Sequence, residues 1–103
     1  MSRGEVWWVE DPEAGRRPHL VITREAAIPV LHSVLAVPAT GTTRRIPTEV
    51  ALTREDGMAS ECALTLDNLT VLPKGFFVEL ICRLSTEKMR EVCAALAIAT
   101  GCE

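Results

Sequence analysis

The stretch SVLAVPATGTTRRIPTEVAL, residues 33–52, joins two apolar segments through a polar, basic connection. Residues 33–40 are rich in Val, Leu and Ala and predict a strand, and Pro38 near its end indicates an edge position or a bulge. Residues 48–52, TEVAL, predict the next strand. The glycine, hydroxyls and guanidiniums of the connection are typical of an exposed loop. The middle of the chain is therefore expected to be two strands with a polar loop between them.

Further strand patterns lie on both sides of this stretch. They are EVWWV at 5–9, HLVIT at 19–23, CALTL at 62–66, LTVL at 69–72 and FFVELICRL at 76–84. Pro18 is expected at the first position of the second of these strands, where its missing N–H costs little. Only the end of the chain predicts a helix. Ser85 is a suitable N-cap, apolar residues recur after it at intervals of three and four, and Gly101 can end the helix.

Many short strands and one terminal helix predict a fold that is mainly β with α. The expected architecture is a small, strongly bent sheet or barrel with the helix packed on it. With 103 residues, the chain 1–103 is expected to be a single domain.

The N-terminal residues show no apolar stretch between a basic start and a small-residue cleavage site, so no secretory signal is expected. The longest apolar run, Cys93 to Ala99, is far shorter than the roughly 20 residues of a membrane helix. These features favour a cytoplasmic protein that does not bind a membrane.

The four cysteines, Cys62, Cys82, Cys93 and Cys102, match no common zinc-binding spacing. They are expected to be small buried apolar side chains rather than ligands or disulfides. His19 and His32 are the two histidines, and no metal centre is expected. The two could form an acid–base pair, although neither lies in the basic loop.

Charge is distributed unevenly along the chain, whose formal net charge is −3. Residues 16–45 hold five arginines and one acidic residue, Glu25, so that the rest of the chain is strongly acidic. A basic zone on an acidic body can mark a face that binds anions. The alternative is a chance bias over thirty residues.

Two residues in this zone are candidates for chemistry on a phosphate. Arg17 directly precedes Pro18, and its planar, always charged guanidinium suits a phosphate. Thr40 ends the strand at 33–40 and opens the loop that holds Thr42, Thr43, Arg44 and Arg45. Such a loop can wrap a phosphodiester with hydroxyls, backbone N–H groups and arginines together. The alternatives are an arginine that merely solvates a turn and an ordinary solvated loop.

Three other residues have open roles. Trp7 and Trp8 are adjacent, so in a strand they face opposite sides. One is expected in the core, and the other could stack on a base or pack at a subunit interface. Glu13 is the carboxylate near Arg17 in the intervening turn, where it could accept a proton or simply be solvated. No sequence motif for a serine nucleophile, a nucleotide-phosphate loop or a zinc protease is present.

These segments together resemble the MazF/PemK-type toxins of bacterial toxin–antitoxin pairs. The resemblance is carried in order by RGEVWWV, RRPHLVIT, LAVPATGTTRRIPTEVAL, LDNLTVL and LSTEKMREVCAAL, which cover nearly the whole chain. It implies an SH3-like barrel that dimerises, is inhibited by a cognate MazE-like antitoxin, and cuts single-stranded RNA at short motifs without a metal or cofactor.

The resemblance implies roles for particular residues. Arg17 and Thr40 fall on the family's catalytic pair, and Glu13 lies near an acidic residue that some members use, in a loop that is shorter here. Arg16 and the threonines and arginines of residues 42–45 would contact the RNA backbone. His19 departs from the small apolar residue that usually follows the proline.

The expected reaction uses the 2′-hydroxyl of RNA as nucleophile, which explains the missing enzyme nucleophile. Arg17 and Thr40 would then stabilise charge on the pentavalent phosphorus. The base that removes the 2′ proton stays open between Glu13, water and an arginine, because a guanidinium is a poor base. Two other functions remain on the same fold, a toxin that poisons DNA gyrase by binding it and an SH3-like binding module.

Overall fold

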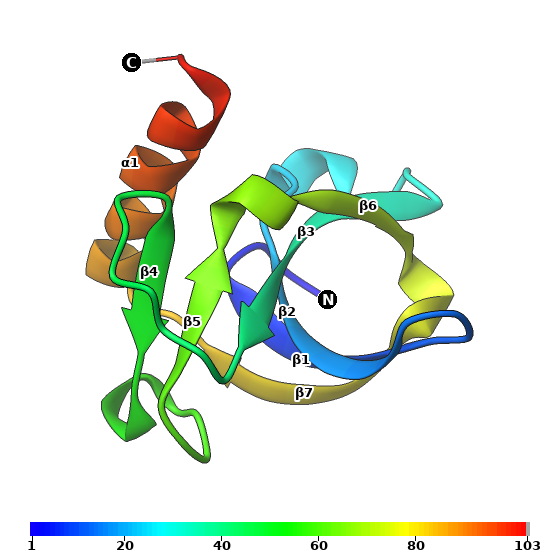
Figure 1. Cartoon of the computed structure of the whole chain (residues 1–103). Helices are drawn as coiled ribbons and strands as arrows, with labels where there is room; N and C mark the ends of the chain where they lie inside the picture. Colours follow the sequence, from blue (N-terminus) through cyan, green and yellow to red (C-terminus); the bar gives the residue numbers. More distant parts are fainter. Residues whose placement is uncertain (103) are drawn as a thin grey trace.

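The computed structural model describes residues 1–102, which form a curled antiparallel sheet and a C-terminal helix (Figure 1). The strands are β1 (Glu5–Asp11), β2 (Gly15–Val21), β3 (Ser33–Thr40), β4 (Glu49–Leu52), β5 (Cys62–Thr65), β6 (Thr70–Pro73) and β7 (Phe77–Arg83). The helices are the 3-10 segments η1 (Glu25–Ala27), η2 (Arg54–Asp56), η3 (Leu66–Asn68) and η4 (Lys74–Phe76), and the α-helix α1 (Thr86–Thr100). Within residues 1–102, no helix is long and apolar enough to cross a membrane.

The strands follow the order β4-β5-β3-β2-β1-β7, and β6 pairs with the first half of β3. In Figure 1 the sheet curls through β1, β2, β3, β6 and β7, while β4 and β5 extend toward α1. The two ends of the order, β4 and β7, do not pair with each other in the described part of the chain, so the barrel is partly open. The predicted bent, barrel-like sheet with one terminal helix is confirmed.

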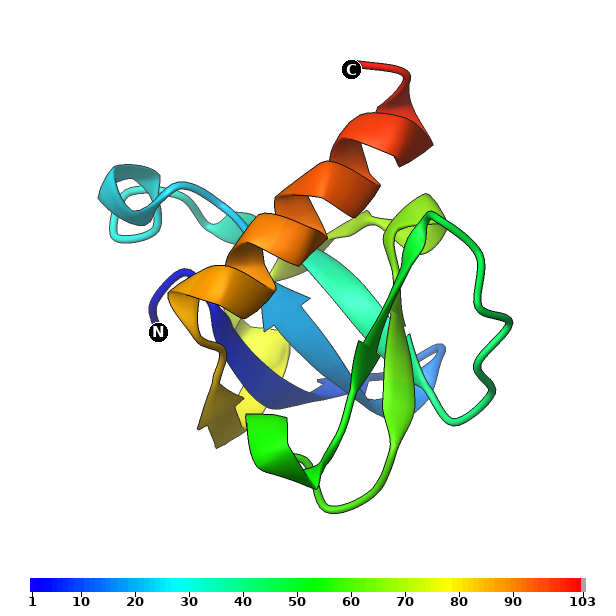
Figure 2. The ribbon, with the colours of Figure 1, turned by 90° about the vertical axis from the view of Figure 1, so that its left-hand side faces the viewer.

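Two apolar clusters form because successive residues of a strand face opposite sides of the sheet. On β2, Leu20 packs in the cluster beneath α1, and Val21 packs in the cluster inside the curl. Val92 and Ala95 of α1 close the first cluster, and Figure 2 shows the helix running across the sheet. Full burial of an aliphatic side chain of this kind stabilises the fold by about 1.5–3 kcal/mol. The two clusters therefore hold the curled sheet from both of its faces.

The two ends of α1 form as the sequence predicts. The Oγ atom of Ser85 accepts a hydrogen bond from the backbone N–H of Lys88 at 3.1 Å, which satisfies one free donor of the first turn. Gly101 follows the helix with a φ of 72°, a left-handed conformation that favours glycine.

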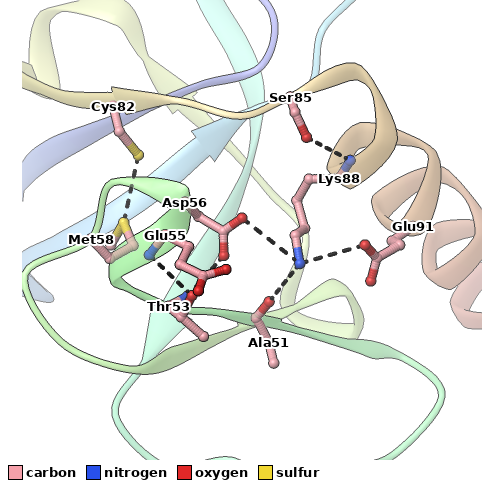
Figure 3. A network of polar contacts seen from close by, with 9 residues as sticks. All are labelled: Ala51, Thr53, Glu55, Asp56, Met58, Cys82, Ser85, Lys88 and Glu91. Carbon is pink, nitrogen blue, oxygen red and sulfur yellow. Dashed lines mark hydrogen bonds and ion pairs between the residues drawn. The ribbon is translucent and has the colours of Figure 1, made fainter.

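A polar network fastens α1 to the β4–β5 side of the sheet (Figure 3). The Nζ atom of Lys88 lies 3.8 Å from Oδ1 of Asp56 and 3.4 Å from Oε2 of Glu91, and it donates to the carbonyl of Ala51 at 3.4 Å. Asp56 is itself fixed, because its Oδ2 accepts the backbone N–H of Thr53 at 2.8 Å in the capping box of η2. Each charged group of this network thus has a protein partner.

Strand β2 differs from its prediction in a way that matters for function. It begins at Gly15, so Arg17 and Pro18 lie inside the strand, and the prediction of Pro18 at its first position is wrong. The strand extends because β1 pairs with it as far as Asp11 opposite Gly15. Pro18 is tolerated there because β3 pairs with β2 only at residues 19–21, which leaves one edge free at Pro18.

Candidate functional site

The ladder between β2 and β3 stops at a pair of prolines. Its last pair is His19 opposite Pro38, and Pro18 is the next residue of β2. Both prolines lack an N–H group and cannot donate to the ladder. If the register is continued by two residues, Arg17 falls opposite Thr40. The two candidate residues therefore lie at the same end of neighbouring strands, just beyond the point where the strands stop pairing.

Arg17 stands at the outer end of a row on one face of β2. The row runs from Val21, which is fully buried, through His19, which is 9% exposed, to Arg17, which is exposed. Alternate residues share a face of a strand, so the row leads from the inner cluster to its open mouth. The guanidinium of Arg17 makes no hydrogen bond or ion pair with any side chain or carbonyl of residues 1–102. It is a charged donor without a protein acceptor.

A pocket of about 300 Å³ surrounds this row where it reaches the surface. Its lining is mostly polar or small, and comes from β1, β2, β3, η3, β6 and the turn after β1: Asp11, Ala14, Gly15, Arg17, His19, Pro38, Asn68, Thr70 and Leu72. An arginine at the rim of such a pocket can meet an anionic group that enters it.

Thr40 lines a different pocket. This second space of about 230 Å³ also holds Trp8, Pro18 and Ile81. The hydroxyl of Thr40 donates to the carbonyl of Thr42 at 3.0 Å, so it is turned toward its own loop. The structure thus brings Arg17 and Thr40 to one end of the sheet, but within residues 1–102 no hydrogen bond joins them.

Arg16 and Trp8 form one unit on the opposite face of the β1–β2 hairpin. The guanidinium carbon of Arg16 lies 4.6 Å from the ring centroid of Trp8, a cation–π distance. Nη1 of Arg16 is 2.9 Å from Oε2 of Glu10, and its Nη2 is 3.8 Å from Oε1 of Glu79. Trp7 packs against the inner cluster as expected for the core member of the pair, although it is only half-buried. Arg16 therefore covers one face of the Trp8 ring.

The β3–β4 loop is tied down by the first residue of β4. Arg44 donates its backbone N–H to Oε1 of Glu49 at 2.9 Å and its Nε to Oε2 at 2.6 Å. Burial raises the pKa of Glu49, but the hydrogen bonds and the charge of Arg44 outweigh it, so the pKa is lowered. Thr42, Thr43 and Arg45 are exposed in the same loop, and the guanidinium of Arg45 forms no ion pair within residues 1–102.

The fold neutralises part of the positive charge of residues 16–45. Arg16 and Arg44 pair with Glu10, Glu79 and Glu49, all of which lie outside residues 16–45. Arg17 and Arg45 have no such partner in the described part of the chain. The cations available to an anion are therefore fewer than the sequence count implies.

Other expected roles fare differently. Glu13 is exposed in the hairpin turn, where its N–H donates to Oδ1 of Asp11 at 2.8 Å, and it lines a pocket next to β6 that does not include Arg17. His32 directly precedes β3, whereas His19 faces Pro38 near the end of that strand, so the two histidines do not form a pair.

The expectation that all four cysteines are buried is wrong. Cys93 and Cys102 are exposed, while Cys62 and Cys82 are half-buried against the cluster beneath α1, and all four are free thiols. Burial raises the pKa of the Cys62 and Cys82 thiols, which keeps them protonated. Residues 1–102 contain no group of three or more His, Cys, Asp or Glu side chains that could hold a metal ion.

Comparison with known proteins identifies the family. Residues 2–100 match the family described as PemK-like, MazF-like toxin of type II toxin-antitoxin system. The chain belongs to this family. It is 40% identical to the probable endoribonuclease MazF5 of Mycobacterium tuberculosis, over 98% of this chain and 94% of the relative. It is 38% identical to the probable endoribonuclease MazF2 of the same species, over 99% of this chain and 100% of the relative.

Solved structures agree with the fold of this MazF-like toxin. An endoribonuclease in complex with its cognate antitoxin, from a mycobacterial species, has a TM-score of 0.90 at 29% identity, over 100% of this chain and 97% of that one. The Mycobacterium tuberculosis toxin MazF-mt6 has a TM-score of 0.87 at 25% identity, over 94% of this chain and 96% of that one. The resemblance read from the sequence is confirmed.

From the sequence, His19 is considered as a partner of His32 but is not placed at the site with Arg17. His19 lies next to Arg17 on the pocket wall. A strand starting at Gly15 would have shown that Arg17 and His19, two residues apart, share a face. The spacing of the two residues is visible in the sequence, but the strand expected from it begins at residue 19 and therefore leaves Arg17 out.

Proposed function

We propose that this chain, a toxin endoribonuclease of the MazF type, cleaves single-stranded RNA by attack of a 2′-hydroxyl on the adjacent phosphodiester. Its catalytic donors are Arg17 and Thr40. The observation that supports this assignment is the Arg17 guanidinium, which has no protein acceptor in residues 1–102 and lies opposite Thr40 in the continued register of β2 and β3.

The reaction follows from what these groups can supply. The 2′-oxygen forms a bond to phosphorus as the bond to the 5′-oxygen breaks, which gives a 2′,3′-cyclic phosphate and a 5′-hydroxyl. Negative charge grows on the non-bridging oxygens during this step. A fixed guanidinium and a hydroxyl aimed at those oxygens stabilise the transition state more than the ground state. The substrate provides the nucleophile, so the protein needs neither a nucleophile nor a metal ion for this route.

Thr40 needs a local change to take part. Its hydroxyl now donates to the carbonyl of Thr42 in an exposed loop. Rotation about one side-chain bond releases that hydrogen bond and turns the hydroxyl toward an entering phosphate. Thr42, Thr43 and Arg45, together with Arg16 and Arg44 when their carboxylate partners release them, would contact the RNA backbone.

The proposal also covers the oligomeric state of the toxin, its protein partner and its location in the cell. The toxin works as a single domain, forms a homodimer, and is inhibited in the bacterial cytoplasm by a cognate antitoxin protein. One similar structure is described as an endoribonuclease in complex with its cognate antitoxin, which supports the last partner. The gyrase-poison and binding-module alternatives gain no support, because the curated relatives are named endoribonucleases.

The test is cleavage of single-stranded RNA by the purified toxin in EDTA. Wild-type protein is expected to cut, to leave cyclic phosphate ends, and to spare an RNA with a 2′-deoxynucleotide before the scissile phosphate. Thr40→Ala is expected to lower the single-turnover rate by about 10²-fold, the scale of one lost transition-state donor. Absence of cleavage in EDTA, or cleavage of the 2′-deoxy substrate, would contradict the mechanism.

A further inference from the structure

His19 occupies an unusual place for a histidine in a small β-barrel. It lies between a fully buried valine and an exposed arginine on one face of β2, and it is 9% exposed. Its ring forms part of the wall of the pocket at whose rim Arg17 lies. It is therefore close to the guanidinium that would hold a phosphate, and it is screened from bulk solvent.

The hydrogen bonding of His19 fixes its tautomer. Nδ1 lies 3.2 Å from the backbone carbonyl oxygen of Arg17. A carbonyl oxygen only accepts, so Nδ1 carries the proton and donates it. In the neutral ring, Nε2 then has a free lone pair. Nε2 makes no hydrogen bond within residues 1–102, and no buried side-chain nitrogen in that part of the chain lacks a partner, so Nε2 reaches the space of the pocket.

The surroundings keep the ring neutral at physiological pH. Burial lowers the pKa of His19, and the positive charge of Arg17 lowers it further. The hydrogen bond to the Arg17 carbonyl and the charge of Asp11 act in the opposite direction, but the pKa stays below its usual value. Asp11 from β1 and Arg17 from β2 are the charged residues of the pocket wall, to which β3, η3 and β6 contribute only uncharged side chains.

The other acids and bases near Arg17 are less suited to accept a proton. Glu13 lines the neighbouring pocket rather than this one. Oδ1 of Asp11 already accepts the backbone N–H groups of Glu13 and Ala14, at 2.8 and 3.3 Å, and so holds the hairpin turn. Arg17 is protonated at any pH in a cell. A carboxylate such as that of Asp11 is ordinarily a weaker base than a neutral imidazole. His19 is the imidazole in this pocket, and the hydrogen bond of Nδ1 holds its ring in one orientation.

We propose that Nε2 of His19 is the general base that takes the proton from the attacking 2′-hydroxyl. This inference rests on the proposed function. The 2′-O–H bond breaks as the proton passes to Nε2, the 2′-oxygen bonds to phosphorus, and the 5′-oxygen leaves and takes a proton from water. The imidazolium returns its proton to solvent after the cyclic phosphate departs. The bond from Nδ1 to the Arg17 carbonyl holds the imidazole in one orientation, next to the residue whose guanidinium would bind the phosphate.

The test compares His19→Asn with the wild type in single-turnover cleavage of a short RNA that contains the mapped cut site. Asparagine can keep the donor to the Arg17 carbonyl but has no acceptor at the position of Nε2. The rate is expected to fall about 10²-fold or more, the usual contribution of a general base. His32→Asn is the matched control, because His32 is exposed and lies outside the pocket. Its rate is expected to stay within about twofold of wild type.

The pH profile separates a base from a structural residue. Wild-type rate is expected to rise with pH while His19 loses its proton, and to level off above an inflection below the ordinary histidine pKa of about 6.5. His19→Asn is expected to lose this inflection. A His19→Asn rate within threefold of wild type would overturn the proposal, and so would a lowered rate that keeps the wild-type inflection.

A second measurement tests the proposal on the wild-type protein, in case His19→Asn does not fold. The pKa of His19 in the wild-type protein is read from the NMR titration of its ring protons and compared with the kinetic inflection. Agreement supports the proposal, and a disagreement of more than about one pKa unit overturns it. Failure of the proposed function would look different, because wild-type protein would then not cleave RNA in EDTA at all.

Discussion

Two groups of polar side chains in this toxin differ in how fully the protein satisfies them. In the network of Figure 3, Lys88 has two carboxylates and a carbonyl within 3.8 Å, and Asp56 is also held by a backbone N–H. At the mouth of the barrel, Arg17 has no acceptor within residues 1–102, and Nε2 of His19 has no partner there. The first group connects parts of the fold. The second leaves donor and acceptor capacity for a molecule that is not part of the chain.

The largest expected effect comes from removing the free charge. Arg17→Ala should lower the rate of RNA cleavage by about 10²-fold or more, because a transition-state donor is lost. Arg16→Ala should lower it less than about tenfold, since Arg16 already pairs with Glu10 and Glu79 and covers Trp8. Initial rates on a short RNA, with circular dichroism to check folding, measure both. Equal losses in the two variants would show that the pairing of Arg16 does not matter for function.

The sequence was sufficient for most of the fold. Strand 33–40 and the helix with its Ser85 and Gly101 ends were predicted with their observed bounds, because capping residues and apolar spacing are local signals. The start of β2 was not, because it depends on pairing with β1 as far as Asp11 opposite Gly15. Pro18 looked like a strand start locally, but the hairpin register extended the strand beyond it.

The arrangement of the candidate site could be predicted from the sequence only in part. Arg17 and Thr40 could be chosen from residue type and resemblance, but their relation depends on the two prolines that end the β2–β3 ladder. The pairing of Arg44 with Glu49 also escaped notice, because it requires the loop to fold back on the first residue of β4. The pocket at His19 joins β1, β2, β3, η3 and β6, and no local pattern indicates that these elements meet.

Substitutions in the β3–β4 loop are expected to have a smaller effect, on RNA affinity, and the loop also offers one free and one paired arginine. The guanidinium of Arg45 is exposed and forms no ion pair in the described residues, whereas Nε of Arg44 lies 2.6 Å from Oε2 of Glu49. Each phosphate contact on single-stranded RNA adds about 0.7 to the slope of log affinity against log salt. Arg45→Ala should therefore weaken binding severalfold and reduce that slope by about 0.7. Arg44→Ala should reduce the slope less, because the ion pair with Glu49 has to open before Arg44 can contact a phosphate.

The binding measurement uses a 2′-O-methyl RNA, which cannot supply the attacking hydroxyl, with fluorescence anisotropy at three salt concentrations. Arg45 has a φ of 55°, and alanine keeps the Cβ atom, so the backbone cost of this conformation is similar in both forms. If Arg44→Ala changed the slope as much as Arg45→Ala, the ion pair with Glu49 would have to open whenever RNA binds.

An acidic antitoxin segment bound to the same loop should respond in the same order, with Arg45→Ala weakening its binding more than Arg44→Ala.

The smallest effect is expected in the satisfied network itself. Lys88→Met keeps most of the apolar stem but removes the charge that joins α1 to Asp56 and Ala51. The Lys88–Asp56 contact is long, at 3.8 Å, and Asp56 keeps the backbone N–H of Thr53 when the lysine is removed, so the free energy of unfolding should fall by only about 0.5–1 kcal/mol. Arg90→Met, on an exposed position of the same helix, should change it by less than about 0.5 kcal/mol. Urea unfolding measures both values, and 1 M salt should reduce the difference between them.

The same variant also tests whether this network affects function. RNA cleavage should be unchanged in Lys88→Met, because the lost contacts only hold the helix against the sheet. A loss of cleavage in a variant that stays folded would mean that the position of α1 controls the barrel mouth, and the two polar groups would then be coupled rather than separate.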